Sequence, residues 1–136
     1  DFFKRVNDRF GLATGVDAIK GLVEVISGRI RSVDLLCRYG GEEFAVLLND
    51  TGAEAGAGVA EELRQRIEAT AILRQTPLTV SIGVCDVAAA ENLDHWLNLA
   101  DGALYLAKRN GRNRVEVAGT EIVRHEPIAK TIPDWR

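Results

Sequence analysis

Residues 35–48 read Leu-Leu-Cys-Arg-Tyr-Gly-Gly-Glu-Glu-Phe-Ala-Val-Leu-Leu, so two strand-like apolar runs are joined by two glycines and two carboxylates. Glycine reaches positive φ at both positions of a tight turn without steric cost. The stretch therefore predicts a β-hairpin that turns at Gly40 and Gly41. The second run, Phe44–Leu48, is continuously apolar, which is typical of a strand covered on both faces.

The turn brings two adjacent acids, Glu42 and Glu43, next to backbone that carries no side chains. Carboxylate oxygens are hard ligands that suit magnesium, and the bare Gly40-Gly41 backbone lets a nucleotide approach closely. The pattern indicates a site for a divalent cation that carries phosphates. A surface hairpin with solvated charges explains the turn equally well, so the turn alone leaves both interpretations open.

Composition limits the class of protein. The chain has 136 residues, of which 46% are hydrophobic, enough for one domain with a single core. A formal net charge of -3 argues against a general nucleic-acid binder, which needs a basic field. We expect Cys37 and Cys85, both in strand-like apolar context, to be reduced core residues of a cytoplasmic domain. Any membrane tether would lie in a segment outside this sequence, because no apolar run here approaches ~18 residues.

Predicted helices and strands alternate around the hairpin. The expected helices cover residues 2–10, 17–30 and 53–69, and a stretch through Ala107 that follows a cap at Asn92 or Asp94. The expected strands are the two of the hairpin, Leu78–Val84 and Arg114–Ala118. This order predicts an α/β fold, an α+β sandwich in which a mixed central sheet carries helices on both faces.

Apolar side chains at helical spacing give the expected core. We expect buried stripes on the second, third and fourth helices, formed by Ile19, Val23, Ile26 and Ile30, by Val59, Leu63 and Ile67, and by Leu93, Trp96, Leu97, Ala100, Ala103, Leu104 and Ala107. The last of these stripes is better explained as core than as a binding surface.

Five ordered blocks carry a family resemblance. Arg38–Phe44 resembles the signature of the GGDEF family, the diguanylate cyclases, in its GGEEF form. The other matching blocks are Asp1–Asp8, Arg31–Asp34, Ser81–Val84, and Ala100–Tyr105 running into Lys108–Arg114. The resemblance implies an N-terminally truncated GGDEF domain over residues 1–118 and a C-terminal extension over 119–136. It also implies a fold related to nucleotidyl cyclases and polymerase palms, with a first strand just before Asp1 that this sequence lacks.

The resemblance implies a specific reaction. In the family two domains face each other as a homodimer, each with one GTP, and each 3'-hydroxyl attacks the other α-phosphate to give cyclic di-GMP and pyrophosphate. The implied cofactor is Mg²⁺, two ions per active site, with Mn²⁺ as an alternative. The implied partners are GTP, cyclic di-GMP as product and inhibitor, and an upstream sensor or regulatory domain; no nucleic acid is expected.

Site residues carry over by position. Glu42 becomes a metal ligand, and Glu43 a second ligand or a base. The backbone amides of Phe2 and Phe3 would face phosphate oxygens at a helix start, although the rings can also be core. Lys108 and Arg112, four residues apart, match the pair that the family uses on the triphosphate. Without the other motifs, this pair would be explained as compensation of a helix dipole.

Two further positions match ligand-contacting residues. Asn7 matches the guanine-contacting asparagine of the family; alone it would be an exposed polar residue of a helix. Arg31 and Asp34 stand at the offset of the inhibitory cyclic di-GMP site, where an arginine fork grips a guanine edge or a phosphate. The alternative is a helix-end arginine beside an acid. Glu62 stands where relatives often carry an arginine that completes this site.

The sequence also departs from the family pattern. Leu12 replaces a histidine, and Val16 replaces the guanine-binding aspartate. Valine accepts no hydrogen bond, and an unpaired donor costs about 1 to 3 kcal/mol, so GTP binding should weaken and purine selectivity should relax. Asp17 is a poor substitute, since one residue along a helix points ~100° away. The other metal-binding aspartate of the family lies two positions before Asp1.

Three functions are compatible with these residues. Intact Glu42, Glu43, Lys108 and Arg112 favour a cyclase, weakened by Val16 and Leu12. A degenerate domain that binds GTP or cyclic di-GMP and signals without turnover is the main alternative, with Val16 and Leu12 as its evidence. An adaptor without a ligand leaves the retained carboxylates unexplained. The sequence therefore favours the diguanylate cyclase.

Overall fold

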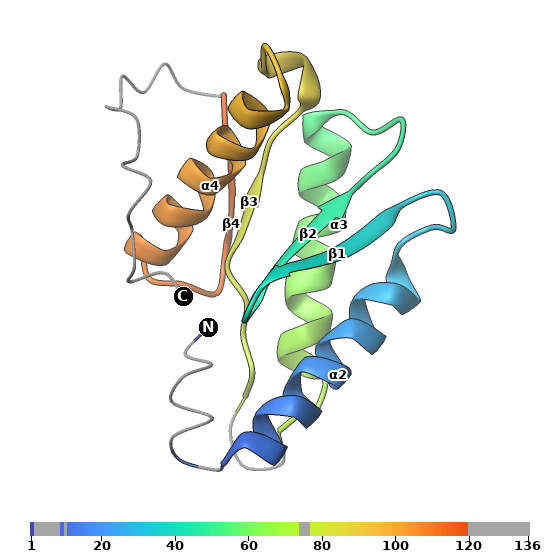
Figure 1. The fold of residues 1–136 in the computed structure, drawn as a ribbon, viewed down its shortest axis with the longest axis vertical. Coiled ribbons are helices and arrows are strands. Elements are labelled where there is room, and N and C mark those ends of the chain that lie inside the picture. Colours follow the sequence, from blue (N-terminus) through green and yellow to red (C-terminus); the bar gives the residue numbers. More distant parts are fainter. Residues whose placement is uncertain (2–8, 10, 74–76, 120–136) are drawn as a thin grey trace.

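The computed structural model describes residues 1, 9, 11–73 and 77–119 (Figure 1). The elements are α2 (Leu12–Arg29), β1 (Leu35–Gly40), β2 (Glu43–Leu47), α3 (Ala53–Ala69), β3 (Ile82–Val84), the 3₁₀ helix η1 (Val87–Ala89), α4 (Leu93–Arg109) and β4 (Val115–Val117). The predicted helix over 2–10, apart from Arg9, and the extension beyond Gly119 lie outside the described residues.

The strands form two pairs. β1 and β2 are antiparallel, in a register that pairs Leu35 with Leu47 and Arg38 with Phe44. β3 and β4 are parallel and pair Ile82 with Val115. Within the described residues each pair is a separate two-stranded sheet, and β3 and β4 lie between α4 and α3 (Figure 1). The predicted α+β class with strands of mixed direction is confirmed.

The hairpin turn differs from the prediction in its backbone. Among the described glycines, positive φ occurs at Gly11, Gly111 and Gly119, and not at Gly40 or Gly41. The register instead shifts between Arg38 and Gly40, a bulge that bends the strand into the turn. Space is also tight at Gly40, because a Cβ there would lie 3.1 Å from a carboxylate oxygen of Glu43, which would have to shift.

Helix α2 begins five residues before the predicted start. Gly11, at φ 87°, precedes the helix, and Gly15 continues it although glycine is a weak helix former. Gly15 is buried, so packing outweighs its low propensity. Ile26 is buried as predicted, but Ile19 and Val23 are only half-buried.

One apolar core lies where α2 and α3 meet. Its buried residues are Ala18, Leu22 and Ile26 of α2, Leu63 and Ile67 of α3, and Leu73 and Leu78 of the following segment. Phe44 and Val46 of β2 pack against it, which fixes the hairpin over the two helices. The boundaries predicted for α3, 53–69, are confirmed. Cys37 and Cys85, expected in the core, are half-buried.

Helix α4 begins where one of the two predicted caps placed it. The side chain of Asn92 accepts a hydrogen bond of 2.8 Å from the His95 amide, so Asn92 is the cap and Asp94 lies in the first turn. The prediction that Leu93 and Leu97 are core is wrong, because they are 63% and 39% exposed. Leu93 stands at the helix start, and Leu97 faces a cavity instead of packed side chains.

Two strand predictions need correction. Leu47 of β2 is 37% exposed, so this strand is not covered on both faces; among the described strands it pairs only with β1. The strand predicted over Leu78–Val84 is limited to Ile82–Val84, because residues 78–81 have no ladder partner within the described chain. None of the described helices combines the length and apolar character that crossing a bilayer requires.

Strand β3 and helix α4 meet at Gly83 with their backbones in close approach. A Cβ at Gly83 would lie 2.2 Å from the carbonyl oxygen of Ala100 and 2.4 Å from the amide nitrogen of Leu104. Neither backbone atom can move without displacing the helix. Gly83 therefore sets the distance between the sheet and α4.

We expect Gly83→Ala to lower the free energy of unfolding by about 3 kcal/mol, because overpacked backbone must shift. Gly58→Ala is the matched control: Gly58 lies in α3 with open space around it, and alanine there should stabilise by about 0.5–1 kcal/mol. Urea denaturation of both variants measures the difference. Equal stability of the two variants would contradict the close approach.

Candidate functional site

Four of the predicted site residues line one cavity. The cavity, of about 670 Å³, is bounded by α2, β2, α3, β3 and α4, and it is lined mostly by apolar side chains that include core residues such as Leu22 and Leu63. Its charged lining includes Glu42 and Glu43 of the hairpin, Lys108 of α4, Arg112 of the loop that follows, and Asp1. Four site residues separated by as many as 70 positions in the sequence thus meet at one cavity.

The two glutamates differ in burial. Glu42 occupies the turn and is half-buried, whereas Glu43 begins β2 and is 7% exposed. Glu43 folds its carboxylate back over Gly40, where a side chain would crowd it, while Gly41 is exposed with open space around it. The Arg38 side chain donates to the Gly41 carbonyl oxygen over 2.9 Å and holds the turn. The turn therefore presents adjacent carboxylate oxygens from a fixed backbone.

Lys108 is a half-buried cation beside these acids. Burial lowers the pKa of the Lys108 ammonium, Glu42 and Glu43 act to raise it, and Arg112 lowers it. Desolvation is the largest cause, so the ammonium carries an electrostatic cost that a nearby anion would offset. The arrangement of two cations and two carboxylates suits a phosphorylated ligand that also carries a divalent metal.

Arg112 does not lie on α4 but in the loop that follows it. The helix ends at Arg109, and Gly111, Arg112 and Asn113 then take φ values of 122°, 65° and 48°. The Arg112 amide donates to the Ala107 carbonyl oxygen over 2.9 Å, which folds the loop back under the helix end. Sequence reasoning missed the contacts of Asn113 with α3. The Asn-Gly-Arg-Asn run was the available signal, because glycine and asparagine favour left-handed backbone.

Arg31 and Asp34 form a separate cluster just after the C-terminal end of α2. Two guanidinium nitrogens of Arg31 reach the Asp34 carboxylate at 3.0 and 3.1 Å, and Arg31 also donates to Thr51 over 3.1 Å. The Asn49 amide donates to Asp34 over 2.9 Å. The Arg31 guanidinium and the backbone amides hold the pKa of Asp34, whose side chain is 2% exposed, well below its usual range. The pair therefore clamps the end of α2 to the turn before α3.

The remaining predicted positions lie elsewhere. Phe2, Phe3 and Asn7 lie outside the described residues. Val16 is 53% exposed and does not line the cavity. Glu62 pairs with Arg29 of α2 and with Arg66, the latter at 3.0 Å, so its charge has a structural use.

The described residues supply only part of a metal site. Within residues 1, 9, 11–73 and 77–119, no group of three or more His, Cys, Asp or Glu side chains could hold a metal ion. Glu42 and Glu43 are two adjacent carboxylates on bare backbone, which is the donor chemistry that Mg²⁺ prefers. Two protein carboxylates with phosphate oxygens and water make a usual magnesium set, so the residues present fit that ion.

Known proteins resemble this chain in sequence and in fold. The family model described as "Diguanylate cyclase, GGDEF domain" matches residues 1–114. Diguanylate cyclase A of Treponema denticola is 40% identical over an alignment 125 residues long, which covers 87% of this chain and 33% of that protein. The active GGEEF domain of a diguanylate cyclase from Vibrio cholerae has a TM-score of 0.82 at 31% identity, over 89% of this chain and 79% of that one.

A ligand-bound structure is also similar. The coiled coil and GGDEF domain of DgcB from Caulobacter crescentus, solved in complex with c-di-GMP, has a TM-score of 0.79 at 32% identity, over 87% of this chain and 65% of that one. Fold and sequence together define an α+β domain of the kind found in diguanylate cyclases. The chain belongs to the GGDEF family. It spans about a third of the length of the Treponema relative.

We expect Asp34→Asn to lower the melting temperature at pH 7, because it removes the charge that Arg31 and the amides stabilise. The folded-state pKa lies below the ordinary 3.8, so this stabilisation is present above that value and is lost as pH falls through the folded pKa. The difference between variant and parent should therefore shrink in acid, as followed by thermal denaturation. Asp17→Asn, on the exposed face of α2, should change little. A pH-independent difference would contradict this assignment.

Proposed function

We propose that this domain is a diguanylate cyclase that condenses two GTP into cyclic di-GMP and pyrophosphate across a homodimer. The observation that carries the proposal is the single cavity lined by Glu42, Glu43, Lys108 and Arg112. Two carboxylates that suit a metal and two cations that suit a triphosphate thus line the same cavity.

Glu42 and Glu43 would hold Mg²⁺, or Mn²⁺ in its place, with two ions per active site. The bound metal would supply charge neutralisation at the phosphates and activate the attacking oxygen. Glu42, in the turn, is the more accessible ligand, and buried Glu43 is the second ligand or the base that takes the 3'-hydroxyl proton. In the family the remaining metal-binding aspartate lies two positions before Asp1, so these two carboxylates are part of the set.

Lys108 and Arg112 would hold the triphosphate. Charge-assisted hydrogen bonds to phosphate are about twice as strong as neutral ones, and Arg112 can bind two oxygens at once. Because burial has already removed part of the water around Lys108, an anion gains more from it than from an exposed lysine. Two further roles are proposed on resemblance alone. The backbone amides of Phe2 and Phe3 would contact phosphate, and the side chain of Asn7 would contact guanine.

The reaction balances without an added reactant. Each 3'-oxygen forms a bond to the α-phosphorus of the other nucleotide, and each bond between the α-phosphorus and its bridging oxygen breaks. Two pyrophosphates leave, and the two hydroxyl protons pass to base or solvent. Each domain holds one nucleotide, so in-line attack requires two domains that face each other.

Arg31 and Asp34 are the proposed product-inhibition site. A relative was solved in complex with c-di-GMP, which supports a cyclic dinucleotide as ligand. In this chain the Arg31 side chain is 52% exposed and Asp34 is buried, so the arginine is the accessible half of the pair. An upstream sensor or regulatory domain is also proposed, since this chain corresponds to a third of the Treponema relative.

A receptor that binds nucleotide without turnover is the second candidate, because Val16 replaces a guanine-binding aspartate. One experiment distinguishes the cyclase from the receptor. We expect the full protein, with GTP and Mg²⁺, to form a cyclic dinucleotide identifiable by mass, and Glu42→Gln to lower its rate at least a hundredfold. Glu24→Gln, an exposed glutamate of α2, is the matched control and should keep the activity. Tight cyclic di-GMP binding without product would support the receptor.

Restoring the guanine contact tests the departure at residue 16. We expect Val16→Asp to improve selectivity for GTP over ATP, toward the low end of the roughly five- to 150-fold range that a buried donor partner gives, because residue 16 is 53% exposed. Val16 is exposed, so the change should not unfold the helix. Comparing Val16→Asn with Val16→Asp separates the effect of a hydrogen bond from the effect of a charge. Unchanged selectivity in an active enzyme would show that residue 16 does not contact the base.

A further inference from the structure

The loop after α4 holds Arg112 in a backbone conformation that arginine disfavours. Arg112 and Asn113 are consecutive non-glycine residues with φ values of 65° and 48°, and Gly111 before them is at 122°. Asparagine adopts left-handed backbone more readily than arginine does, and arginine stays there where surrounding contacts fix it. The loop is held by the hydrogen bond from the Arg112 amide to Ala107 and by contacts from α3 and from Asp1.

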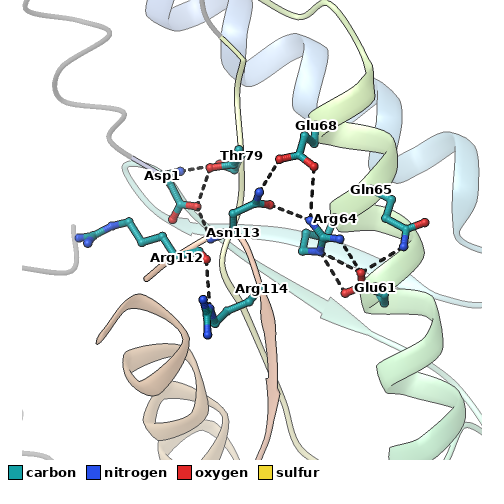
Figure 2. A network of polar contacts seen from close by, with 9 residues as sticks. All are labelled: Asp1, Glu61, Arg64, Gln65, Glu68, Thr79, Arg112, Asn113 and Arg114. Atoms are coloured by element: carbon teal, nitrogen blue, oxygen red, sulfur yellow. Dashed lines mark hydrogen bonds and ion pairs between the residues drawn. The ribbon is translucent and has the colours of Figure 1, made fainter. Parts of the chain in front are cut away.

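Helix α3 supplies the first contact, through Arg64 (Figure 2). Arg64 donates from Nη1 to the side-chain oxygen of Asn113 over 2.9 Å, and the Asn113 amide nitrogen donates to Glu68. Glu61 fixes the guanidinium, accepting from Nε at 3.0 Å and from Nη2 at 2.5 Å. The Arg64 side chain is 15% exposed, so these contacts are largely shielded from water.

Asp1 supplies the second contact, to the backbone of the same residue. The Asn113 amide donates to an Asp1 carboxylate oxygen over 3.2 Å, and the Thr79 hydroxyl donates to that oxygen over 2.9 Å (Figure 2). The Ser81 hydroxyl donates to the other oxygen over 2.7 Å. Asn113 is thus held through its side chain by α3 and through its backbone by Asp1, which in turn accepts hydrogen bonds from the segment before β3.

Arg112 stands beside this anchor without contributing its side chain to it. Its carbonyl oxygen accepts from Nε of Arg114 over 3.2 Å, while its guanidinium extends away from the network (Figure 2). Arg112 lines the cavity with Lys108. The contacts of Asn113 therefore fix the backbone from which the Arg112 guanidinium projects toward the cavity.

We infer that Arg64 and Asn113 are positioning residues that orient Arg112 for the triphosphate, with Asp1 as the backbone support. The inference rests on the proposed function, because it assigns the oriented guanidinium to a nucleotide. Arg64 and Asn113 do not line the cavity and would touch no ligand. Their effect on binding passes wholly through Arg112.

A double-mutant cycle in the full-length protein tests the inference. The probe is the α,β-methylene analogue of GTP with Mg²⁺, which binds without turnover, and calorimetry gives its dissociation constant. We expect Arg112→Ala, Arg64→Gln and Asn113→Gly each to weaken binding, by roughly three- to thirtyfold. Glycine at 113 keeps the left-handed backbone available while removing the amide contacts. Adding Arg64→Gln or Asn113→Gly to Arg112→Ala should weaken binding no further.

Arg66→Gln is the matched control, because Arg66 lies on the same helix, pairs with Glu62 and contacts no residue of the loop in any described hydrogen bond. It should leave binding unchanged. Full additivity with Arg112→Ala would overturn the inference, since independent effects do not pass through Arg112. If Arg64→Gln fails to fold, Asn113→Gly, which changes no helix residue, decides the matter.

The two proposals fail in different ways. If Arg112→Ala binds the analogue as the parent does, the triphosphate role of Arg112 is wrong, and with it this part of the proposed function. If Arg112→Ala weakens binding but folded Arg64→Gln and Asn113→Gly do not, the positioning role is wrong while the nucleotide site stands. In turnover assays the positioning variants should raise the KM for GTP more than they lower kcat.

Discussion

The half-buried Lys108 between two glutamates and an arginine is the interaction on which the candidate site depends. A desolvated ammonium needs nearby negative charge, and Glu42 and Glu43 of the hairpin supply it. Gly83 fixes the position of α4 on β3, because the two backbones approach so closely there that no side chain fits.

The sequence predicts what is local or periodic. The limits of α3 at 53–69 follow from apolar spacing and the preceding turn, and the Asn92 cap follows from its position before an apolar run. Prediction from the sequence fails where contacts between residues far apart in the chain determine the conformation. Leu97 has helical core spacing but faces the cavity, and Gly40 is crowded by Glu43 but does not take positive φ. Arg64 and Asn113 lie 49 positions apart, so the Asn-Gly-Arg-Asn run indicates left-handed backbone but not the contact with Arg64.

The Arg31 and Asp34 pair has a structural role whether or not it binds a nucleotide. Asp34 accepts hydrogen bonds from Arg31 and from the Asn49 amide and is almost fully shielded, so it cannot leave without loosening the end of α2. Arg31 is half exposed and carries donors on several nitrogens. A ligand at this pair would therefore act on a clamp between α2 and the turn before α3. Binding of an inhibitor at this pair would therefore act on how α2 is held against that turn.

The departures from the family pattern bear on base recognition more than on phosphate chemistry. Val16 is exposed and outside the cavity, whereas the carboxylates and cations that would act on the phosphates line it together. Losing a contact to the base weakens binding and relaxes discrimination, but it leaves the charges at the reacting atoms in place. The cyclase with altered purine preference that we propose makes use of these retained charges.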